Sequence, residues 1–201
     1  MRLERITIED NEPYLRQISK PVDFKNNDWK KALEKLAYFC ENDDNIMAIA
    51  SVQLGIPLRL VYVKKTDLNR LEEDYNEKRV FINPKIIKKE GLTTYWEACA
   101  SCLDYTGLVE RPYKIEIEYY DINQQKHIEK LEGLAATVLS HEIDHLDGIL
   151  HIDIAKQIKV LPREERVELR KKEPYTILRK TGPYPEPRQE RKILQKKIQQ
   201  N

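Results

Sequence analysis

The pattern of apolar and polar residues predicts one long helix in the second half of the chain. Over residues 133–149, side chains recur at spacings of three or four, which gathers them on one helical face. That face carries Leu134, Val138, His141 and His145. Gly148 belongs to the residue type that most often ends a helix. We therefore predict a helix over about 133–149 whose buried face includes two histidines.

Shorter patterns predict elements earlier in the chain. Residues 28–42 carry apolar side chains at helical spacing and predict an amphipathic helix. The apolar run at 58–63 predicts a strand. A second strand is expected at 80–82, closed by Asn83 and the proline that follows it. The charged segment 66–79 is expected to form a surface excursion between these strands.

Further patterns cover the C-terminal half and the N-terminus. Residues 115–119 alternate apolar and polar side chains, so they predict a half-buried strand, with 127–131 as its partner. Residues 162–172 predict one more helix. The segment 188–201 has few apolar anchors, so we expect it to be mobile, or helical only on a partner. Residues 1–25 are expected to be extended, since two prolines interrupt them.

The composition fits one domain with a tail: 201 residues, 40% hydrophobic and 34% charged. The formal charge of +1 hides an uneven distribution. Residues 155–201 carry 14 Lys and Arg against 6 Asp and Glu, a balance of +8, so residues 1–154 carry −7. Such a basic extension is either a solvated charged surface or an RNA contact. The acidic body argues against a pure nucleic-acid-binding module.

Nothing in the sequence indicates a membrane or secretion. No run approaches the roughly 18–20 apolar residues of a membrane span. The first residues lack the apolar core of a signal peptide. The 3 cysteines are too few, and odd in number, for a disulfide framework. We expect a soluble, cytoplasmic protein in a reducing compartment.

The predicted central helix contains the motif His-Glu-x-x-His at residues 141–145. Residues four apart on a helix point the same way, so His141 and His145 can bind one metal ion. Glu142 then lies beside that ion and can exchange a proton with a water that the ion holds. The competing interpretation is a surface helix with two unrelated histidines. The chain has only 4 histidines, and two fall in this pattern on a predicted buried face, which favours a metal.

Two histidines leave a tetrahedral ion short of one protein ligand if water takes the fourth position. The candidates for the third ligand are the upstream Cys99 and, downstream, Asp147, His151 and Asp153. Cys99 and Cys102 also form a Cys-x-x-Cys pair, which is compatible with a redox dithiol. The same pair could join the two histidines in a closed Cys2His2 zinc site, in which Glu142 would have no catalytic role.

Three motifs together resemble those of the peptide deformylase family, and the similarity spans roughly residues 10–155. The family's third motif has the form QHE.DHL.G.LF.D, and residues 140–153 read SHEIDHLDGILHID. The second is EGCLS, and residues 97–101 read EACAS. The first is GxGLAAxQ, and residues 46–53 read IMAIASVQ. The stretch LVERP at 108–112 also resembles the family's residues after the second motif.

The resemblance implies an enzyme that removes the formyl group from the N-terminal formylmethionine of nascent peptides. One divalent metal ion is expected, Fe2+ in the cell, with Zn2+, Ni2+ or Co2+ as replacements in preparations. By motif position, its ligands are Cys99, His141 and His145. Glu142 is then the general acid and base. The side chain of Gln53 and the backbone N–H of Ala100 would donate to the formyl oxygen.

The resemblance also implies how the peptide is bound. The nascent chain would lie as an added strand against the backbone of Met47, Ala48 and Ala98. The pocket for the methionine side chain would be formed by Met47, Tyr95, Leu134, Thr137 and Val138. Apart from the resemblance, Glu97 and Arg111 either form an ion pair that braces the second motif or remain two solvated charges.

Several positions depart from the family pattern, none of them at a metal ligand, Gln53 or Glu142. They are Ile46, Ala48, Ser51, Ala98, Ala100, Cys102, Leu103 and Ser140. Because glycine permits close backbone approach, losing it can narrow a peptide groove. The alternative function is therefore a deformylase-like protein with an altered substrate or little activity.

The resemblance implies an α+β fold, with mixed or antiparallel sheets around the central His-Glu-x-x-His helix. We expect a metal-dependent deformylase domain at residues 1–155 and a basic, partly helical extension at 156–201. Formylmethionyl nascent peptides are the expected partners, and the extension is the candidate surface for contact with the ribosome.

Overall fold

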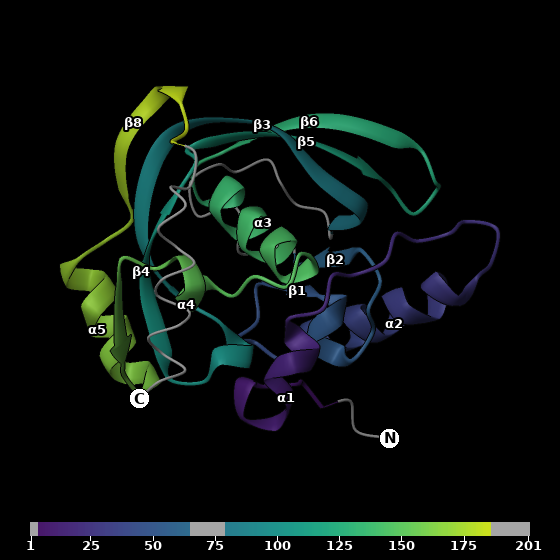
Figure 1. The fold of residues 1–201 in the computed structure, drawn as a ribbon, viewed down its shortest axis with the longest axis horizontal. Helices are drawn as coiled ribbons and strands as arrows, with labels where there is room; N and C mark the ends of the chain where they lie inside the picture. The colour runs from purple at the N-terminus through teal and green to yellow at the C-terminus, as the bar shows by residue number, and fades with distance from the viewer. Residues whose placement is uncertain (1–3, 65–78, 186–201) are drawn as a thin grey trace.

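The computed structural model describes residues 4–64 and 79–185, and it has an α+β fold. The helix α3 (Gly133–Leu146) lies at the centre, and a curved antiparallel sheet wraps around it (Figure 1). The other helices of the described residues are α1 (Ile8–Leu15), α2 (Asp28–Glu41), α4 (His151–Ile154) and α5 (Arg163–Lys172), with 3-10 helices η1 (Ser51–Leu54) and η2 (Ala100–Cys102).

The described strands form one sheet with antiparallel pairing throughout. They are β1 (Ala48–Ala50), β2 (Leu60–Val63), β3 (Arg79–Ala98), β4 (Tyr105–Arg111), β5 (Lys114–Tyr120), β6 (Lys126–Glu132), β7 (Gln157–Val160) and β8 (Thr176–Pro183). The main order is β1-β2-β3-β4-β7. Strands β5 and β8 also pair with β3, and β6 pairs with β5.

The long strand β3 organises the site because it bends over α3 (Figure 1). In its C-terminal half, β4 pairs with one edge and β8 with the other, so that Thr94 stands opposite both Glu110 and Thr176. The strand ends at Ala98, immediately before Cys99. The fold thereby brings a cysteine from the sheet to the helix that carries the two histidines.

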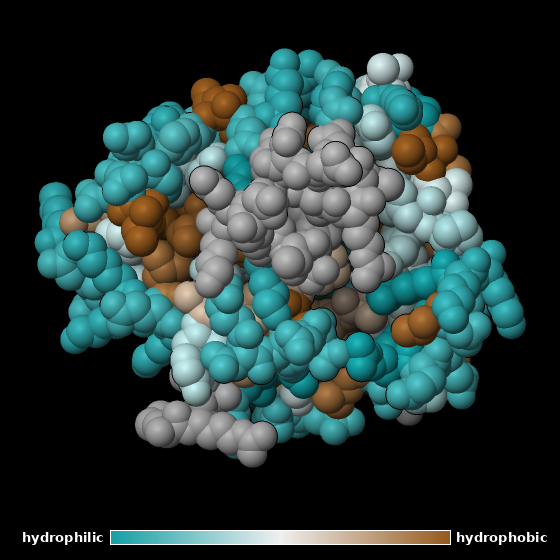
Figure 2. Space-filling view, turned by 180° about the vertical axis from the view of Figure 1, so that it is seen from behind, coloured by the Kyte–Doolittle hydropathy of each residue, from teal (hydrophilic) through white to brown (hydrophobic). Residues whose placement is uncertain are grey.

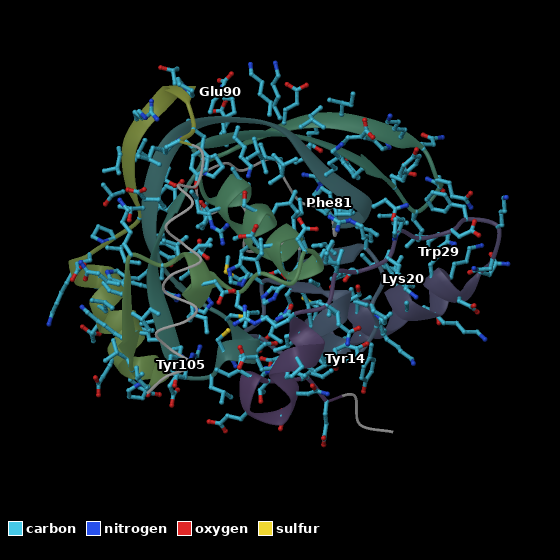
Figure 3. All side chains as sticks on the ribbon, in the orientation of Figure 1. Tyr14, Lys20, Trp29, Phe81, Glu90 and Tyr105 are labelled. Atoms are coloured by element: carbon cyan, nitrogen blue, oxygen red, sulfur yellow. The ribbon has the colours of Figure 1, made fainter. Side chains whose placement is uncertain are left out.

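Two large apolar clusters hold α3 and α2 against the sheet. The cluster between α3 and the sheet includes Phe81, Ile115, Ile117, Leu139 and Ile143. The cluster under α2 includes Trp29, Leu33, Leu36, Ile49 and Leu60. Figure 3 labels one member of each, Phe81 on β3 and Trp29 on α2. Full burial of one such side chain stabilises the fold by roughly 1.5–3 kcal/mol, so these contacts account for the position of α3.

The predicted helices and strands at 28–42, 58–63, 115–119, 127–131 and 162–172 are confirmed as α2, β2, β5, β6 and α5, with small differences at their ends. The central helix ends at Leu146, earlier than predicted. Gly148 follows with a φ of +71°, and a Cβ at this position would collide with the backbone of Arg16. The glycine of the motif is thus required by a left-handed turn under α1.

Two expectations for the first half of the chain are wrong. Residues 1–25 are not extended throughout, since α1 lies within them. Asn11 has non-helical angles, and its side chain accepts a hydrogen bond from Tyr14, so Pro13 stands in the first turn of a new helical segment where proline is tolerated. Asn83 does not close a strand, because β3 continues through it with a register irregularity.

The expectations for residues 66–79 and 188–201 lie almost wholly outside the described residues. On the face seen in Figure 2, exposed apolar residues form separate spots within a mostly hydrophilic surface, in keeping with the high content of charged residues. Within residues 4–64 and 79–185, no helix has the length and apolar character needed to cross a bilayer.

Candidate metal centre

Three side chains with metal-binding atoms converge where β3 ends beside α3. The ligand atoms of Cys99, His141 and His145 all lie within 4.8 Å of one another. The two histidines are one helical turn apart on α3, which turns both rings toward the end of β3. The sulfur of Cys99 lies 3.1 Å from Nε2 of His145. The structure therefore brings together the three ligands predicted from the sequence.

The donor set suits a divalent first-row metal. Two imidazoles and a thiolate are common zinc and iron ligands, and three protein ligands leave room for a further small ligand. Beside them, one carboxylate oxygen of Glu142 is buried without a hydrogen-bond partner among the described residues. Such an oxygen is costly to leave unpaired, so a water or substrate group is expected to complete it. The residues present fit a metal site.

A buried network positions His141. Its Nδ1 lies 2.8 Å from Oε2 of Glu97, which directs Nε2 toward the site. Arg111 donates to both oxygens of Glu97, at 2.7 and 2.9 Å, and also to Asp144. Of the two alternatives that the sequence left open for Glu97 and Arg111, the structure shows the ion pair. Its connections to His141 and Asp144 were not predicted.

Electrostatic effects within this network are strong because its members are buried. Burial alone would raise the pKa of Glu97, but Arg111 and His141 lower it well below the ordinary value. Burial would lower the pKa of His141, but the adjacent Cys99 and Glu97 outweigh that effect and raise it. Glu97 is therefore ionised and accepts hydrogen bonds from both Arg111 and His141.

The sulfur of Cys99 has the character of a thiolate. A hydrogen bond from the thiol of Cys102 and the nearby rings of His145 and His141 lower its pKa well below the ordinary value, although burial opposes them. The same contact with Cys99, together with burial, raises the pKa of Cys102 strongly. Within the Cys-x-x-Cys pair, Cys99 is therefore the more acidic thiol and the better prepared to bind a metal.

Glu142 is nearly inaccessible, with 6% of its surface exposed. Burial raises its pKa, and the two histidines beside it act in the opposite direction. A carboxylate with a raised pKa, next to candidate metal ligands, is suited to accept a proton and to release it again. The placement agrees with the spacing argument for this residue.

Gln53 connects the first motif to the second. Its Oε1 accepts the backbone N–H of Ala50 at 3.0 Å, and its Nε2 donates to the hydroxyl of Ser101 at 3.0 Å. Nε2 is also 3.5 Å from the sulfur of Cys99. Ala100 is the next residue after Cys99 and begins η2. Both predicted oxyanion donors are thus close to Cys99, Gln53 through its side chain and Ala100 as the next residue in the chain.

The other candidate ligands lie outside this group of atoms. Asp147 pairs with Arg59 at 2.6 Å, and Asp153 forms an ion pair with Arg16. His151 is 1% exposed and its ring centroid is 5.7 Å from that of His141, but it is not among the three converging ligands. Of the open alternatives for the third ligand, the geometry favours Cys99.

The predicted substrate residues come from three elements around the metal centre. Met47 precedes β1 and Ala48 begins it, Tyr95 and Ala98 belong to β3, and Leu134, Thr137 and Val138 lie on α3. Thr137 is buried and the others are half-buried. The hydroxyl of Thr137 has no hydrogen-bond partner among the described residues.

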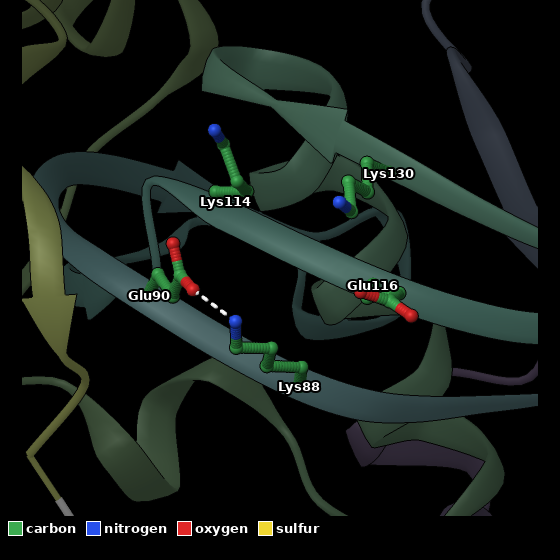
Figure 4. Close-up of a pocket in the computed structure, with 5 residues that line it drawn as sticks. All are labelled: Lys88, Glu90, Lys114, Glu116 and Lys130. Carbon is green, nitrogen blue, oxygen red and sulfur yellow. Dashed lines mark ion pairs between the residues drawn. The ribbon is translucent and has the colours of Figure 1, made fainter.

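A hollow on the outer face of the sheet is a separate feature. It is lined by Lys88, Glu90, Lys114, Glu116 and Lys130, which lie on β3, β5 and β6 (Figure 4). Lys88 pairs with Glu90 at 2.5 Å, and Lys114 pairs with Glu132 at 2.5 Å. This pattern is a ladder of alternating charges across neighbouring strands, which stabilises a solvated sheet face.

A family model described as polypeptide deformylase matches residues 5–160. A peptide deformylase of Pelagibacter ubique (strain HTCC1062) is 37% identical over 160 residues, covering 79% of this chain and 90% of that protein. A peptide deformylase of Rhizobium meliloti (strain 1021) is 37% identical over 149 residues, covering 74% and 83%.

Solved structures give the same result. A peptide deformylase from Thermotoga maritima superposes with a TM-score of 0.67 and 29% identity, covering 78% of this chain and 99% of that chain. A probable peptide deformylase from Synechococcus phage S-SSM7 superposes with a TM-score of 0.65 and 32% identity, covering 76% and 99%. In both cases the match covers 99% of the compared structure, so the whole α+β fold of those structures is present in this chain.

Proposed function

Because this chain belongs to the polypeptide deformylase family, we propose that it hydrolyses the N-formyl group of formylmethionyl peptides and releases formate and a free amino terminus. The observation that carries the proposal is the convergence of Cys99, His141 and His145 beside the buried carboxylate of Glu142. These side chains supply the metal ligands and the proton acceptor that metal-assisted hydrolysis of an amide requires.

We assign the metal to Cys99, His141 and His145, with Fe2+ as the ion in the cell. Bound there, a divalent ion would acidify a water and polarise the formyl oxygen. The Glu97–Arg111 pair keeps the ring of His141 oriented for binding, through the Nδ1 contact of 2.8 Å. The closed Cys2His2 alternative is disfavoured because the converging ligand atoms belong to Cys99, His141 and His145, and Cys102 is not among them.

The proton transfers fall to Glu142. Its carboxylate takes the proton from the attacking water and delivers it to the departing amine, as a group of raised pKa can do in both directions. Gln53 turns its Nε2 from Ser101 toward the formyl oxygen, and the backbone N–H of Ala100 is the second donor. Loss of one such donor costs about 2.7–4 kcal/mol of transition-state stabilisation in other enzymes.

The peptide would be bound mainly through its backbone. We propose that it adds as a strand beside Met47, Ala48 and Ala98, which would leave the side chain of its methionine directed toward α3. Tyr95, Leu134, Thr137 and Val138, with Met47, form the proposed pocket for that side chain. Their half-buried, mostly apolar character supports this assignment.

Newly made chains carry formylmethionine where translation takes place, so we propose that the protein acts in the cytoplasm. The basic extension at 156–201 is the surface we propose for contact with the ribosome, since 155–201 carries the excess of +8. Part of this extension, 186–201, lies outside the described residues.

The test is a direct assay of the loaded enzyme. Protein reconstituted anaerobically with Fe2+ is incubated with formyl-Met-Ala-Ser, and both released amine and formate are measured. Glu142→Ala is the matched control, which should keep one metal per chain and lose about 10²–10⁴-fold in rate. Acetyl-Met-Ala-Ser tests the alternative of a changed substrate. Equal inactivity of wild type and Glu142→Ala on the formyl peptide, with metal bound, contradicts the proposed function.

A further inference from the structure

Tyr175 reaches into the molecule from the segment that joins α5 to β8. Its ring meets the ring of Tyr95 edge-on, with centroids 5.8 Å apart and planes at 61°. Its hydroxyl is buried, and burial raises its pKa, while the hydroxyls of Thr93 and Thr137 act in the opposite direction. Tyr175 is therefore close to β3 on one side and to α3 on the other.

These neighbours define where Tyr175 lies. Thr93 and Tyr95 are two apart on β3, so they face the same side of the sheet, as Glu97 does. Glu97 contacts His141, which shows that this side faces α3. Thr137 precedes His141 by one helical turn. Tyr175 thus fills the space between β3 and the first turns of α3, one turn away from the metal ligands.

The segment that carries Tyr175 is held on both sides. Before it, Glu173 accepts a hydrogen bond from Nε1 of Trp96 at 2.7 Å. Arg170 donates to the carbonyl oxygen of Trp96 at 2.9 Å, and its guanidinium lies 5.1 Å from the ring centroid of Tyr95. After it, β8 begins at Thr176 and pairs with β3. Tyr175 is consequently a fixed part of the wall between β3 and α3.

Two buried hydroxyls meet in this space without hydrogen bonds of ordinary geometry. Neither the hydroxyl of Tyr175 nor that of Thr137 has a partner among the described residues. Leaving such groups unpaired costs about 1–3 kcal/mol each. A thioether sulfur makes favourable contacts with the edges of aromatic rings, so the ring of Tyr175 is a suitable contact for a methionine side chain.

We propose that Tyr175 is the end wall of the methionine pocket and sets the length of side chain that the enzyme accepts. The inference rests on the proposed function, because two of its contacts, Tyr95 and Thr137, are residues assigned there to that pocket. It assigns a specificity role to the C-terminal extension, which lies outside the three motifs. The ring of Tyr175 limits the pocket sterically.

The experiment compares substrates that differ by one methylene group, formyl-methionyl-Ala-Ser and formyl-ethionyl-Ala-Ser, using metal-loaded full-length protein. One methylene in a fitted pocket changes kcat/KM by about 10–200-fold. Tyr175→Ala is expected to raise the ethionine-to-methionine ratio of kcat/KM at least about tenfold over wild type. Tyr175→Phe keeps the wall and should leave the ratio within about twofold, and so should Leu178→Ala, a 51% exposed position on β8.

Binding provides a readout that does not need turnover. The affinities of the product peptides Met-Ala-Ser and ethionyl-Ala-Ser are measured by calorimetry on the same metal-loaded proteins, with Tyr175→Leu as a second variant should Tyr175→Ala fail to fold. If the ratio of the affinities for ethionyl-Ala-Ser and Met-Ala-Ser rises at least about tenfold in either variant, the result supports Tyr175 as the end wall of the pocket. An unchanged ratio in a folded variant overturns it. A wild type that binds Met-Ala-Ser but never hydrolyses formyl-Met-Ala-Ser contradicts the proposed function alone.

Discussion

The carboxylate of Glu97 lies 2.8 Å from Nδ1 of His141, and Arg111 holds the same carboxylate with two hydrogen bonds from the other side. The ring of His141, a proposed metal ligand, is thereby oriented by a carboxylate that Arg111 itself holds in place. Arg111 continues to Asp144, which occupies an unspecified position within the His-Glu-x-x-His motif. The motif helix and the strand that bears Cys99 are thus joined by one buried ionic network.

From this network we expect Glu97→Gln to weaken metal binding by about 10–100-fold, because a neutral amide orients His141 less strongly and leaves Arg111 without its counter-ion. The measurement is competition for Zn2+ between the protein and a chelator of known affinity. Glu110→Gln is the matched control, since Glu110 pairs with Lys156 on the surface of the neighbouring strand. Identical chelator midpoints for Glu97→Gln and wild type would contradict this prediction.

Gln53 is expected to act on turnover and not on metal content. Removal of its Nε2 donor by Gln53→Ala should lower kcat by about 10²–10³-fold, the usual effect of losing one oxyanion donor. Because Oε1 also accepts the N–H of Ala50, circular dichroism must show that the variant remains folded. Metal per chain, measured by mass spectrometry, should equal that of wild type. A variant with full kcat would remove Gln53 from the reaction.

Much of the metal centre could be predicted from the sequence because its signal is local. The spacing of His141 and His145 on one helical face requires no knowledge of the rest of the chain. Cys99 is different, since 42 positions of sequence separate it from His141. Only the resemblance of its motif, and then the path of β3, associated it with the histidines. Local patterns identify residues, but pairing between distant strands determines which of them meet.

The same distinction explains the elements that were not predicted. Strands β1 and β7 have 3 and 4 residues, too short for a pattern with a period of two to be recognised. Strand β8 is exposed along its whole length, so it lacks the alternation of a half-buried strand. No sequence pattern indicated where Tyr175 would lie, because its position depends on how α5 and β8 pack against β3. The proline and asparagine that suggested a strand end at Asn83 were overridden by long-range pairing with β2 and β5.

Replacement of Cys102 distinguishes a catalytic metal site from a closed structural Cys2His2 site. We expect Cys102→Ser to keep one metal per chain, because the converging ligand atoms belong to Cys99, His141 and His145. Cys99→Ser should lose the metal, and Cys40→Ser, at another buried cysteine, should resemble wild type. Metal content after dialysis is the measurement. Loss of metal in Cys102→Ser would favour the Cys2His2 site and would weaken the case for hydrolysis.

His151 should make the stability of the protein fall on acidification. It occupies the position of a phenylalanine in the family motif, and neither ring nitrogen has a hydrogen-bond partner among the described residues. Burial, reinforced by the nearby His141, lowers its pKa from the ordinary 6.5 to about 4. The unfolded chain therefore binds a proton at a higher pH than the folded protein does. The stabilising effect of the neutral ring is complete above about pH 6.5 and is lost as the pH falls toward 4.

His151→Phe removes this linkage and keeps an aromatic ring, somewhat larger than imidazole, at the same position. Between pH 8 and pH 5.5, the free energy of unfolding of wild type should fall by about 1 kcal/mol more than that of the variant, since all other titrating groups are shared. Urea unfolding of both proteins at the two pH values gives the difference directly. Parallel pH dependences would mean that a water or another group satisfies the ring of His151 in the folded state, and that its burial has no energetic consequence for the site next to His141.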